Sequence, residues 1–200
     1  QLQKKDSRLL LVDLGHGKNR LGASIAAQVF CKMGAEAPDV ESAKELRSFF
    51  ETIQKLNAEG KILAYHDKSD GGLYTTALEM AFAGHVGVTL DISKLAGSEL
   101  EILFNEELGA VLQVATENVS AVLSAFENAG LKECVSDIGT LNDSYEYRIG
   151  NYAENISDLR AIWSDTTRRI SALRDNPECA ESEYKLKLEE ADPGITPKVT

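Results

Sequence analysis

Hydrophobic residues in this 200-residue chain recur with two different periods, which alternate along the first 150 residues. Short apolar runs of the kind found in strands stand at 7–15, 61–66, 86–92, 109–115, 131–141 and 145–150. Segments with apolar residues three or four positions apart predict helices at 24–34, from Val40 to a stop at Gly60, at 72–85 and at 116–130, with a helical turn near Leu100. This order predicts an α/β fold, a layered mixed sheet with packed helices.

The ends of the first predicted helix carry capping residues. Ser24 has the side chain that accepts hydrogen bonds at a helix N-terminus, and Gly34 is the type of residue that follows a helix C-terminus. We therefore expect a helix over the whole of 24–34.

The pattern changes after residue 150. The segment "ISDLRAIWSDTTRRISALRD" predicts one long amphipathic helix, with Trp163 as a packing anchor beside Leu159 and Ile162. The remainder, 176–200, is polar and punctuated by proline, which is typical of an extended linker. We therefore predict one domain at 1–150, followed at 151–200 by a helix and a linker.

Charge narrows the possible partners. The net charge of −11 argues against nucleic acid and anionic membranes as partners, because both need basic surfaces. An acidic protein can still bind a nucleotide when a metal ion bridges the phosphates to its carboxylates. No apolar run approaches the length of a membrane span, and three scattered cysteines without a CxxC pair predict free thiols in a reducing cytoplasm. The chain does not begin with Met, so we expect it to be part of a longer protein.

The stretch "HDKSDGG" at 66–72 lies between a predicted strand and a predicted helix. Adjacent glycines let a backbone approach a ligand closely, and the following helix N-terminus favours anions. Ser69 can donate to a phosphate oxygen, while Asp67 and Asp70 are hard oxygen ligands suited to Mg²⁺. The alternative is a capped turn without a ligand. A metal site shared by His66 and Asp67 is disfavoured, because neighbours on an extended segment point to opposite faces.

Two other polar clusters are weaker candidates. Glu106 and Glu107 could face a substrate pocket or bind a metal ion, but paired acids before a strand are more often a solvated turn, which we favour here. The loop that holds His16, Lys18 and Arg20 could bind a small anion, and an exposed loop is the more common outcome.

Four segments, "RLGASIAAQVF", "AYHDKSDGGLYTTALEMAFAG", "FNEELGAVLQV" and "RRISALRDNPECAESEYK", together resemble the large single-chain phosphoribosylformylglycinamidine synthases of purine biosynthesis. The resemblance covers nearly the whole chain, in the family's order, and shorter forms of the signal recur in the wider superfamily of aminoimidazole ribonucleotide (AIR) synthase. It implies that residues 1–150 form the second AIR-synthase-type C-terminal domain of such an enzyme, followed by a connector. Ala23 stands where many relatives have glycine, a change that is tolerated if its φ is negative.

The resemblance also implies a function. The family enzyme is an ATP-dependent C–N ligase that uses glutamine-derived ammonia to convert formylglycinamide ribonucleotide to formylglycinamidine ribonucleotide. By the match, Asp67 is a Mg²⁺ ligand and Ser69 contacts ATP or ADP, with no catalytic residue in this chain. The partners implied are the upstream synthetase halves and a downstream glutaminase domain, so the isolated chain should be inactive. Two alternatives stay open: a structural module that holds Mg-nucleotide without turnover, or a related synthetase or kinase of the same superfamily.

Overall fold

The chain divides into two compact units. The computed structural model describes residues 1–190, and its packing separates Gln1–Ala153 from a second unit that begins at Glu154. The assignment of 1–150 and 151–200 as functional domains stays a prediction.

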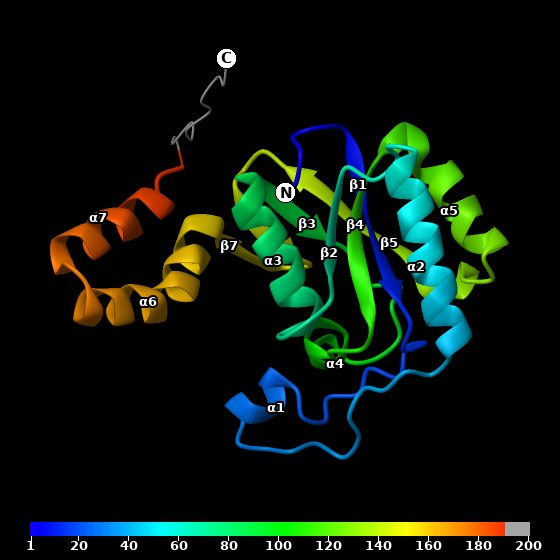
Figure 1. Cartoon of the computed structure of the whole chain (residues 1–200), viewed down its shortest axis with the longest axis horizontal. Coiled ribbons are helices and arrows are strands. Elements are labelled where there is room, and N and C mark those ends of the chain that lie inside the picture. Colours follow the sequence, from blue (N-terminus) through cyan, green and yellow to red (C-terminus); the bar gives the residue numbers. More distant parts are fainter. Residues whose placement is uncertain (191–200) are drawn as a thin grey trace. The chain divides into compact units, whose positions relative to one another are not determined.

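The first unit is built on a seven-stranded sheet (Figure 1). Its order is β2-β4-β1-β5-β3-β6-β7, and the pairs of β1 with β4 and β5, β2 with β4, and β3 with β5 are antiparallel, whereas β3 and β6 are parallel. The strands are β1 (Ser7–Asp13), β2 (Ala64–Asp67), β3 (Gly87–Leu90), β4 (Gly109–Ala115), β5 (Val135–Asn142), β6 (Glu146–Ile149) and β7 (Tyr152–Asn155). The predicted mixed sheet is therefore confirmed, and β7 is an addition to it.

Helices cover both faces of this sheet (Figure 1). The first unit contains α1 (Ile25–Val29), α2 (Ala43–Ala58), α3 (Gly72–Gly84), α4 (Glu99–Phe104) and α5 (Val119–Asn128), with short 3-10 turns at Thr116–Asn118 and Lys132–Cys134. Helices α2 and α5 pack on one face, and α3 lies against β2, β3 and β4. The predicted layered arrangement of helices on a sheet is confirmed.

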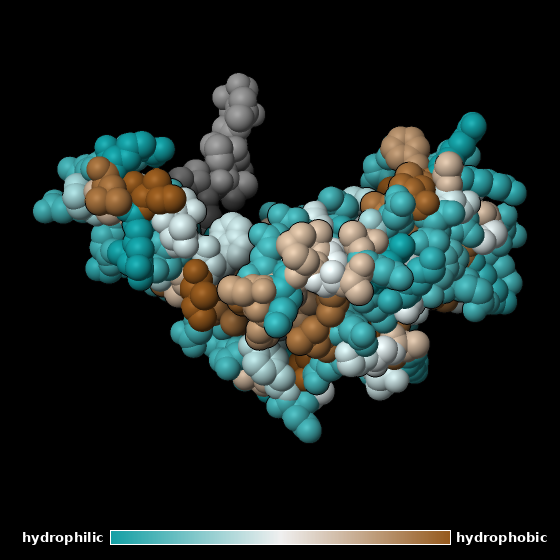
Figure 2. Space-filling view, turned by 90° about the horizontal axis from the view of Figure 1, so that it is seen from below, coloured by the Kyte–Doolittle hydropathy of each residue, from teal (hydrophilic) through white to brown (hydrophobic). Residues whose placement is uncertain are grey.

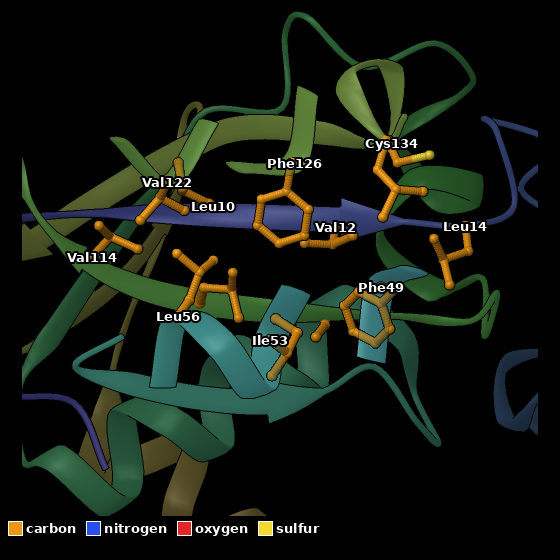
Figure 3. Close-up of a cluster of buried hydrophobic side chains, with 13 residues drawn as sticks. Leu10, Val12, Leu14, Phe49, Ile53, Leu56, Val114, Val122, Phe126 and Cys134 are labelled. Atoms are coloured by element: carbon orange, nitrogen blue, oxygen red, sulfur yellow. The ribbon is translucent and has the colours of Figure 1, made fainter. Parts of the chain in front are cut away.

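The core between the sheet and helices α2 and α5 follows from strand alternation. Figure 3 shows Phe49 and Ile53 of α2 and Phe126 of α5 beside Leu10 and Val12 of β1. Side chains two positions apart on a strand share a face, so one face of β1 supplies this core while the intervening residues point to the opposite face of the sheet. Phe126 is completely buried.

The first helix is shorter than predicted. Ser24 does cap it, because its Oγ accepts the Ala27 N–H at 3.1 Å, but the helix ends at Val29 rather than continuing to Gly34. The chain then folds back, so that the Ala23 N–H donates to the carbonyl of Met33 at 2.8 Å. The N–H groups of Phe30 and Lys32 still donate to carbonyls of the helix, and the chain reverses after them instead of adding further turns.

The fold-back also places Ala23 in the left-handed region, with φ of 59°. The condition under which alanine would be tolerated at this position, a negative φ, is therefore not met. Because glycine carries no Cβ penalty there, Ala23→Gly is expected to add a net of about 0.5 kcal/mol to the free energy of unfolding, after allowing for the extra entropy that glycine gives the unfolded chain. Chemical denaturation measures this change. Ala35→Gly, at an exposed residue outside the positive-φ set, should destabilise instead, and a loss of stability in both variants would contradict the expectation.

The second unit corrects the sequence prediction in two places. Helix α6 (Ile156–Arg174) was predicted, but the segment predicted as an extended linker contains α7 (Pro177–Lys187), which packs on α6. Asn176 caps α7 by accepting the backbone N–H groups of Glu178 and Cys179, and proline suits the first turn. Trp163 is 55% exposed, so it is not a buried anchor. The part of the linker prediction at 191–200 lies outside the described residues.

The face drawn in Figure 2 is mostly hydrophilic, with apolar side chains gathered near its centre. Within residues 1–190, every helix is too short or too polar to cross a lipid bilayer. Cys31, Cys134 and Cys179 are free thiols, as predicted, and burial raises the pKa of Cys134 to about 11.

Candidate functional site

The "HDKSDGG" stretch forms the turn that joins β2 to α3, and we refer to residues 67–72 as the β2–α3 turn. Strand β2 ends at Asp67, and the Lys68 N–H still donates to the carbonyl of Gly109 in β4 at 2.8 Å. Gly71 precedes α3 with φ of 80°, in the left-handed conformation that glycine adopts without steric cost. The Gly72 N–H closes the turn on the carbonyl of Ser69 at 2.9 Å.

Side chains along this turn alternate between solvent and interior. The Asp67 side chain is 71% exposed and Ser69 is exposed, whereas the Lys68 side chain between them is only 2% exposed. This is the alternation of an extended segment carried two residues past the strand, to Ser69. Asp67 and Ser69, the two residues predicted to contact a metal-bound nucleotide, therefore both face solvent. The buried side chain of Lys68 holds the segment between them in place.

The buried ammonium group of Lys68 has two oxygen partners. Its Nζ lies 2.7 Å from Oδ1 of Asn105 and 3.4 Å from Oδ1 of Asp13. Burial lowers the pKa of Lys68, and the Asp13 carboxylate opposes that effect. Reasoning from the sequence gave Lys68 no role, although its place between two outward residues was a usable signal.

The carboxylate of Glu106 is a second group that holds the β2–α3 turn. Its Oε1 accepts the Gly71 N–H at 2.8 Å and the N–H of Ile25, the first residue of α1, at 2.9 Å. The favoured interpretation of Glu106 as part of a solvated turn was wrong, because its carboxylate serves as a shared cap for two chain segments.

For Glu107 the prediction of a solvated turn was also wrong. Its side chain is fully buried, and its carboxylate accepts Nε and Nη2 of Arg20 at 2.7 Å each, in a bidentate pair. The hydrogen bond to Glu107 raises the pKa of Arg20. A buried carboxylate needs such a partner, because taking its charge out of water is costly.

The loop that holds His16, Lys18 and Arg20 is not an anion site. His16 lies 2.8 Å from Glu45 and Lys18 lies 2.6 Å from Glu41, so both side chains already have a carboxylate partner within the chain. His16 and Lys18 are exposed, as the favoured interpretation of this loop expected, whereas Arg20 is only 11% exposed.

Both ring nitrogens of His66 lie close to oxygen atoms. Its Nε2 lies 3.1 Å from Oε2 of Glu79 on α3, and its Nδ1 lies 2.8 Å from the carbonyl oxygen of Asp67. His66 Nδ1 also lies 3.8 Å from Oδ1 of Asp67, so the two side chains are closer than the alternation of an extended segment predicts, while Glu79 connects His66 to α3.

A polar cavity of about 210 Å³ lies beside the buried end of this network. Its lining includes Asp13, Asn19, Lys68, Lys94 and Asn105. The cavity connects the end of β1 with the segment before β4, so both contribute to the surroundings of Lys68.

Asp67 fits one part of a magnesium site. Within residues 1–190, no three His, Cys, Asp or Glu side chains gather closely enough to hold a metal ion by themselves. Mg²⁺ is commonly bound through one or two carboxylates, with phosphates and water completing its shell, and the exposed Asp67 carboxylate can supply one of these.

Comparisons with known proteins agree with this fold. Residues 4–150 match the family described as "AIR synthase related protein, C-terminal domain". Among solved structures, PurLQS from Thermotoga maritima has a TM-score of 0.61 at 12% identity, over 78% of this chain and 26% of that one. T. maritima PurL complexed with FGAR has a TM-score of 0.62 at 14% identity, over 80% of this chain and 28% of that one.

A third structure widens the comparison. HypE from E. coli, a hydrogenase maturation protein, has a TM-score of 0.55 at 17% identity, over 78% of this chain and 50% of that one. The chain thus spans about a quarter of the length of the Thermotoga proteins and half of HypE. At these identities the structures establish a shared fold, while the family match covers most of the sequence. The chain therefore belongs to the family of AIR synthase related proteins, whose C-terminal domain it carries.

Proposed function

We propose that the β2–α3 turn of this chain holds a magnesium-bound nucleotide, ATP or ADP, within a phosphoribosylformylglycinamidine synthase. The observation that carries the proposal is the joint exposure of Asp67 and Ser69 on either side of the buried Lys68. Family membership and the likeness to PurL, which was solved in complexes with ATP and with ADP, support it.

The proposed roles follow from the chemistry of each group. Asp67 would bind Mg²⁺ through its carboxylate, and the Ser69 hydroxyl would donate to a phosphate oxygen. Magnesium would neutralise phosphate charge, which an acidic chain needs before it can hold a nucleotide. Lys68 keeps both outward residues in place through Asn105 and Asp13.

The activity proposed for the whole protein is the ATP-dependent amidation of formylglycinamide ribonucleotide. It needs the upstream synthetase halves and the glutaminase domain as partners, because this chain supplies no catalytic residue in the proposal. Three free thiols suit the reducing cytoplasm where we place the protein. A related ATP-dependent enzyme of the superfamily is the second candidate, because the likeness to HypE covers half of that chain.

Titration calorimetry with Mg-ADP and Mg-ATP on the intact protein tests the site. Ser69→Ala is expected to raise the Kd about tenfold or more, because it removes one hydrogen bond to a charged group. Asp67→Asn is expected to raise it further, since it keeps the shape but removes the charge that binds the metal. Asp143→Asn, an exposed aspartate in another turn, is the control for lost charge and should leave the Kd unchanged.

Thermal melts add a second measurement to the same variants. A nucleotide that binds only the native state stabilises it by mass action, so saturating Mg-ADP should raise the melting temperature of the original protein more than that of Asp67→Asn. Equal affinities and equal melting shifts in the two would contradict the site and leave the turn as a capped connection.

A further inference from the structure

Three consecutive residues, Asn105, Glu106 and Glu107, contact two loops that are distant in the sequence. The first loop is the β2–α3 turn. The second, residues 16–25, lies between β1 and α1, includes Ile25 as the first residue of α1, and is called here the β1–α1 loop. We call residues 105–107 the clasp, because they lie between α4 and β4 and touch both loops.

Two residues of the clasp bond to both loops at once. Oε1 of Glu106 accepts from Gly71 in the β2–α3 turn at 2.8 Å and from Ile25 in the β1–α1 loop at 2.9 Å. Asn105 does the same through its amide: its Oδ1 accepts from Lys68 at 2.7 Å, and its Nδ2 donates to Oδ1 of Asn19 at 3.1 Å.

Glu107 completes the clasp on one side. Its carboxylate accepts the Arg20 backbone N–H at 3.0 Å as well as the guanidinium group, so the β1–α1 loop is held by main chain and side chain together. Asn105 is 2% exposed and Glu107 is fully buried. Because buried polar bonds are strong only when every partner is satisfied, movement of one loop disturbs the partners of the other.

We propose that the clasp couples the β1–α1 loop to the β2–α3 turn, with Glu106 as the positioning residue that fixes the nucleotide-binding turn. The link between this coupling and the nucleotide rests on the proposed function, whereas the coupling itself does not. Glu106 acts through the backbone of Gly71: a carboxylate at the start of α3 interacts favourably with the helix dipole and holds the turn that displays Asp67 and Ser69.

Nucleotide affinity distinguishes two possible roles of Glu106: positioning the β2–α3 turn, or competing with phosphate for the Gly71 N–H. Because Glu106 holds the Gly71 N–H, a phosphate at the turn takes its hydrogen bond from the Ser69 hydroxyl instead of displacing the carboxylate. If Glu106 competed with phosphate for that N–H, its removal would tighten nucleotide binding. If Glu106 positions the turn, its removal weakens binding.

Amide hydrogen exchange on the nucleotide-free intact protein, read by NMR, tests the coupling. Glu106→Ala is expected to speed exchange about tenfold or more at both Gly71 and Ile25, because each N–H loses a charge-assisted partner. Glu106→Gln keeps an acceptor oxygen of the same shape, so it should restore most of the protection at both positions. Glu117→Ala, at an exposed glutamate outside both loops, controls for lost charge and should change neither.

The outcomes that overturn the proposal are specific. Faster exchange at only one of the two amides, or at neither, would show that the loops are not coupled through Glu106. If Glu106→Ala does not fold, Glu106→Gln decides alone: a joint, smaller rise at Gly71 and Ile25 supports the clasp, and a change confined to one amide overturns it.

Calorimetry with Mg-ADP then tests the positioning role. We expect Glu106→Ala to raise the Kd about tenfold and Glu106→Gln to recover most of the affinity. A lower Kd in Glu106→Ala would overturn positioning in favour of competition. If the original protein binds no Mg-ADP, the proposed function fails, and the exchange data still decide whether the clasp couples the loops.

Discussion

Replacing Glu107 with alanine is expected to lower the free energy of unfolding by about 3 kcal/mol, because it leaves the Arg20 guanidinium group partly buried without its main partner. The Glu107 side chain is fully buried and Arg20 is only 11% exposed. The loss should fall at the lower end of the usual range for breaking a buried pair, since Arg20 keeps Glu41 at 2.9 Å. Denaturant unfolding followed by circular dichroism measures the change.

Two further variants isolate the cause. Glu107→Gln keeps the volume and one acceptor oxygen, so its loss should be smaller than that of Glu107→Ala. Glu51→Ala breaks another Arg–Glu pair, with Arg47, whose side chains are 80% and 61% exposed, and should leave stability essentially unchanged because exposed pairs contribute little. Equal losses of unfolding free energy in Glu107→Ala and Glu51→Ala would show that burial does not increase the contribution of the Arg20–Glu107 pair to stability.

Gly72→Ala is expected to lower the free energy of unfolding by about 2–4 kcal/mol, combining backbone strain with overpacking. Gly72 has φ of 64°, and a Cβ there would lie 2.6 Å from the carbonyl oxygen of Asn105 and 2.7 Å from that of Leu103. Both are backbone atoms, so relief of the contact requires the β2–α3 turn to move away from the clasp. Nucleotide affinity should fall with stability for the same reason.

Gly130→Ala is the matched control for Gly72→Ala. Gly130 also has a positive φ, 78°, but a Cβ there would meet nothing within 4 Å. Its loss should therefore be backbone strain alone, about 1 kcal/mol. The same unfolding measurement compares the two variants, and losses of equal size would mean that close packing of the turn against Asn105 does not matter.

Local pattern predicted most of the elements that frame this site. The apolar run at 7–15 became β1, and the segment at 72–85 became the well-buried helix α3. Both rest on side-chain periodicity and on glycine at the turn, which are properties of neighbouring residues. The role of Gly71 and Gly72 as a turn at the start of α3 was accessible for the same reason.

The side-chain contacts inside the site could not be predicted from the pattern of neighbouring residues. Glu107 was expected to be solvated, because paired acids usually are. Its carboxylate can be buried because it pairs with Arg20, which is far away in the sequence. Helix α7 was missed because its polar composition resembles that of a linker, whereas packing on α6 and the Asn176 cap stabilise it as a helix. The burial of Glu107 and the formation of α7 both depend on contacts with another segment of the chain.

A crystal structure of the intact protein with Mg-ADP tests the central proposal most directly. We expect the metal within bonding distance of an Asp67 carboxylate oxygen, about 2.0–2.1 Å, and a phosphate oxygen within hydrogen-bonding distance of the Ser69 hydroxyl. Glu106 should keep its bond to the Gly71 N–H in that complex. A nucleotide bound elsewhere, with the β2–α3 turn touching neither metal nor phosphate, would contradict the proposal.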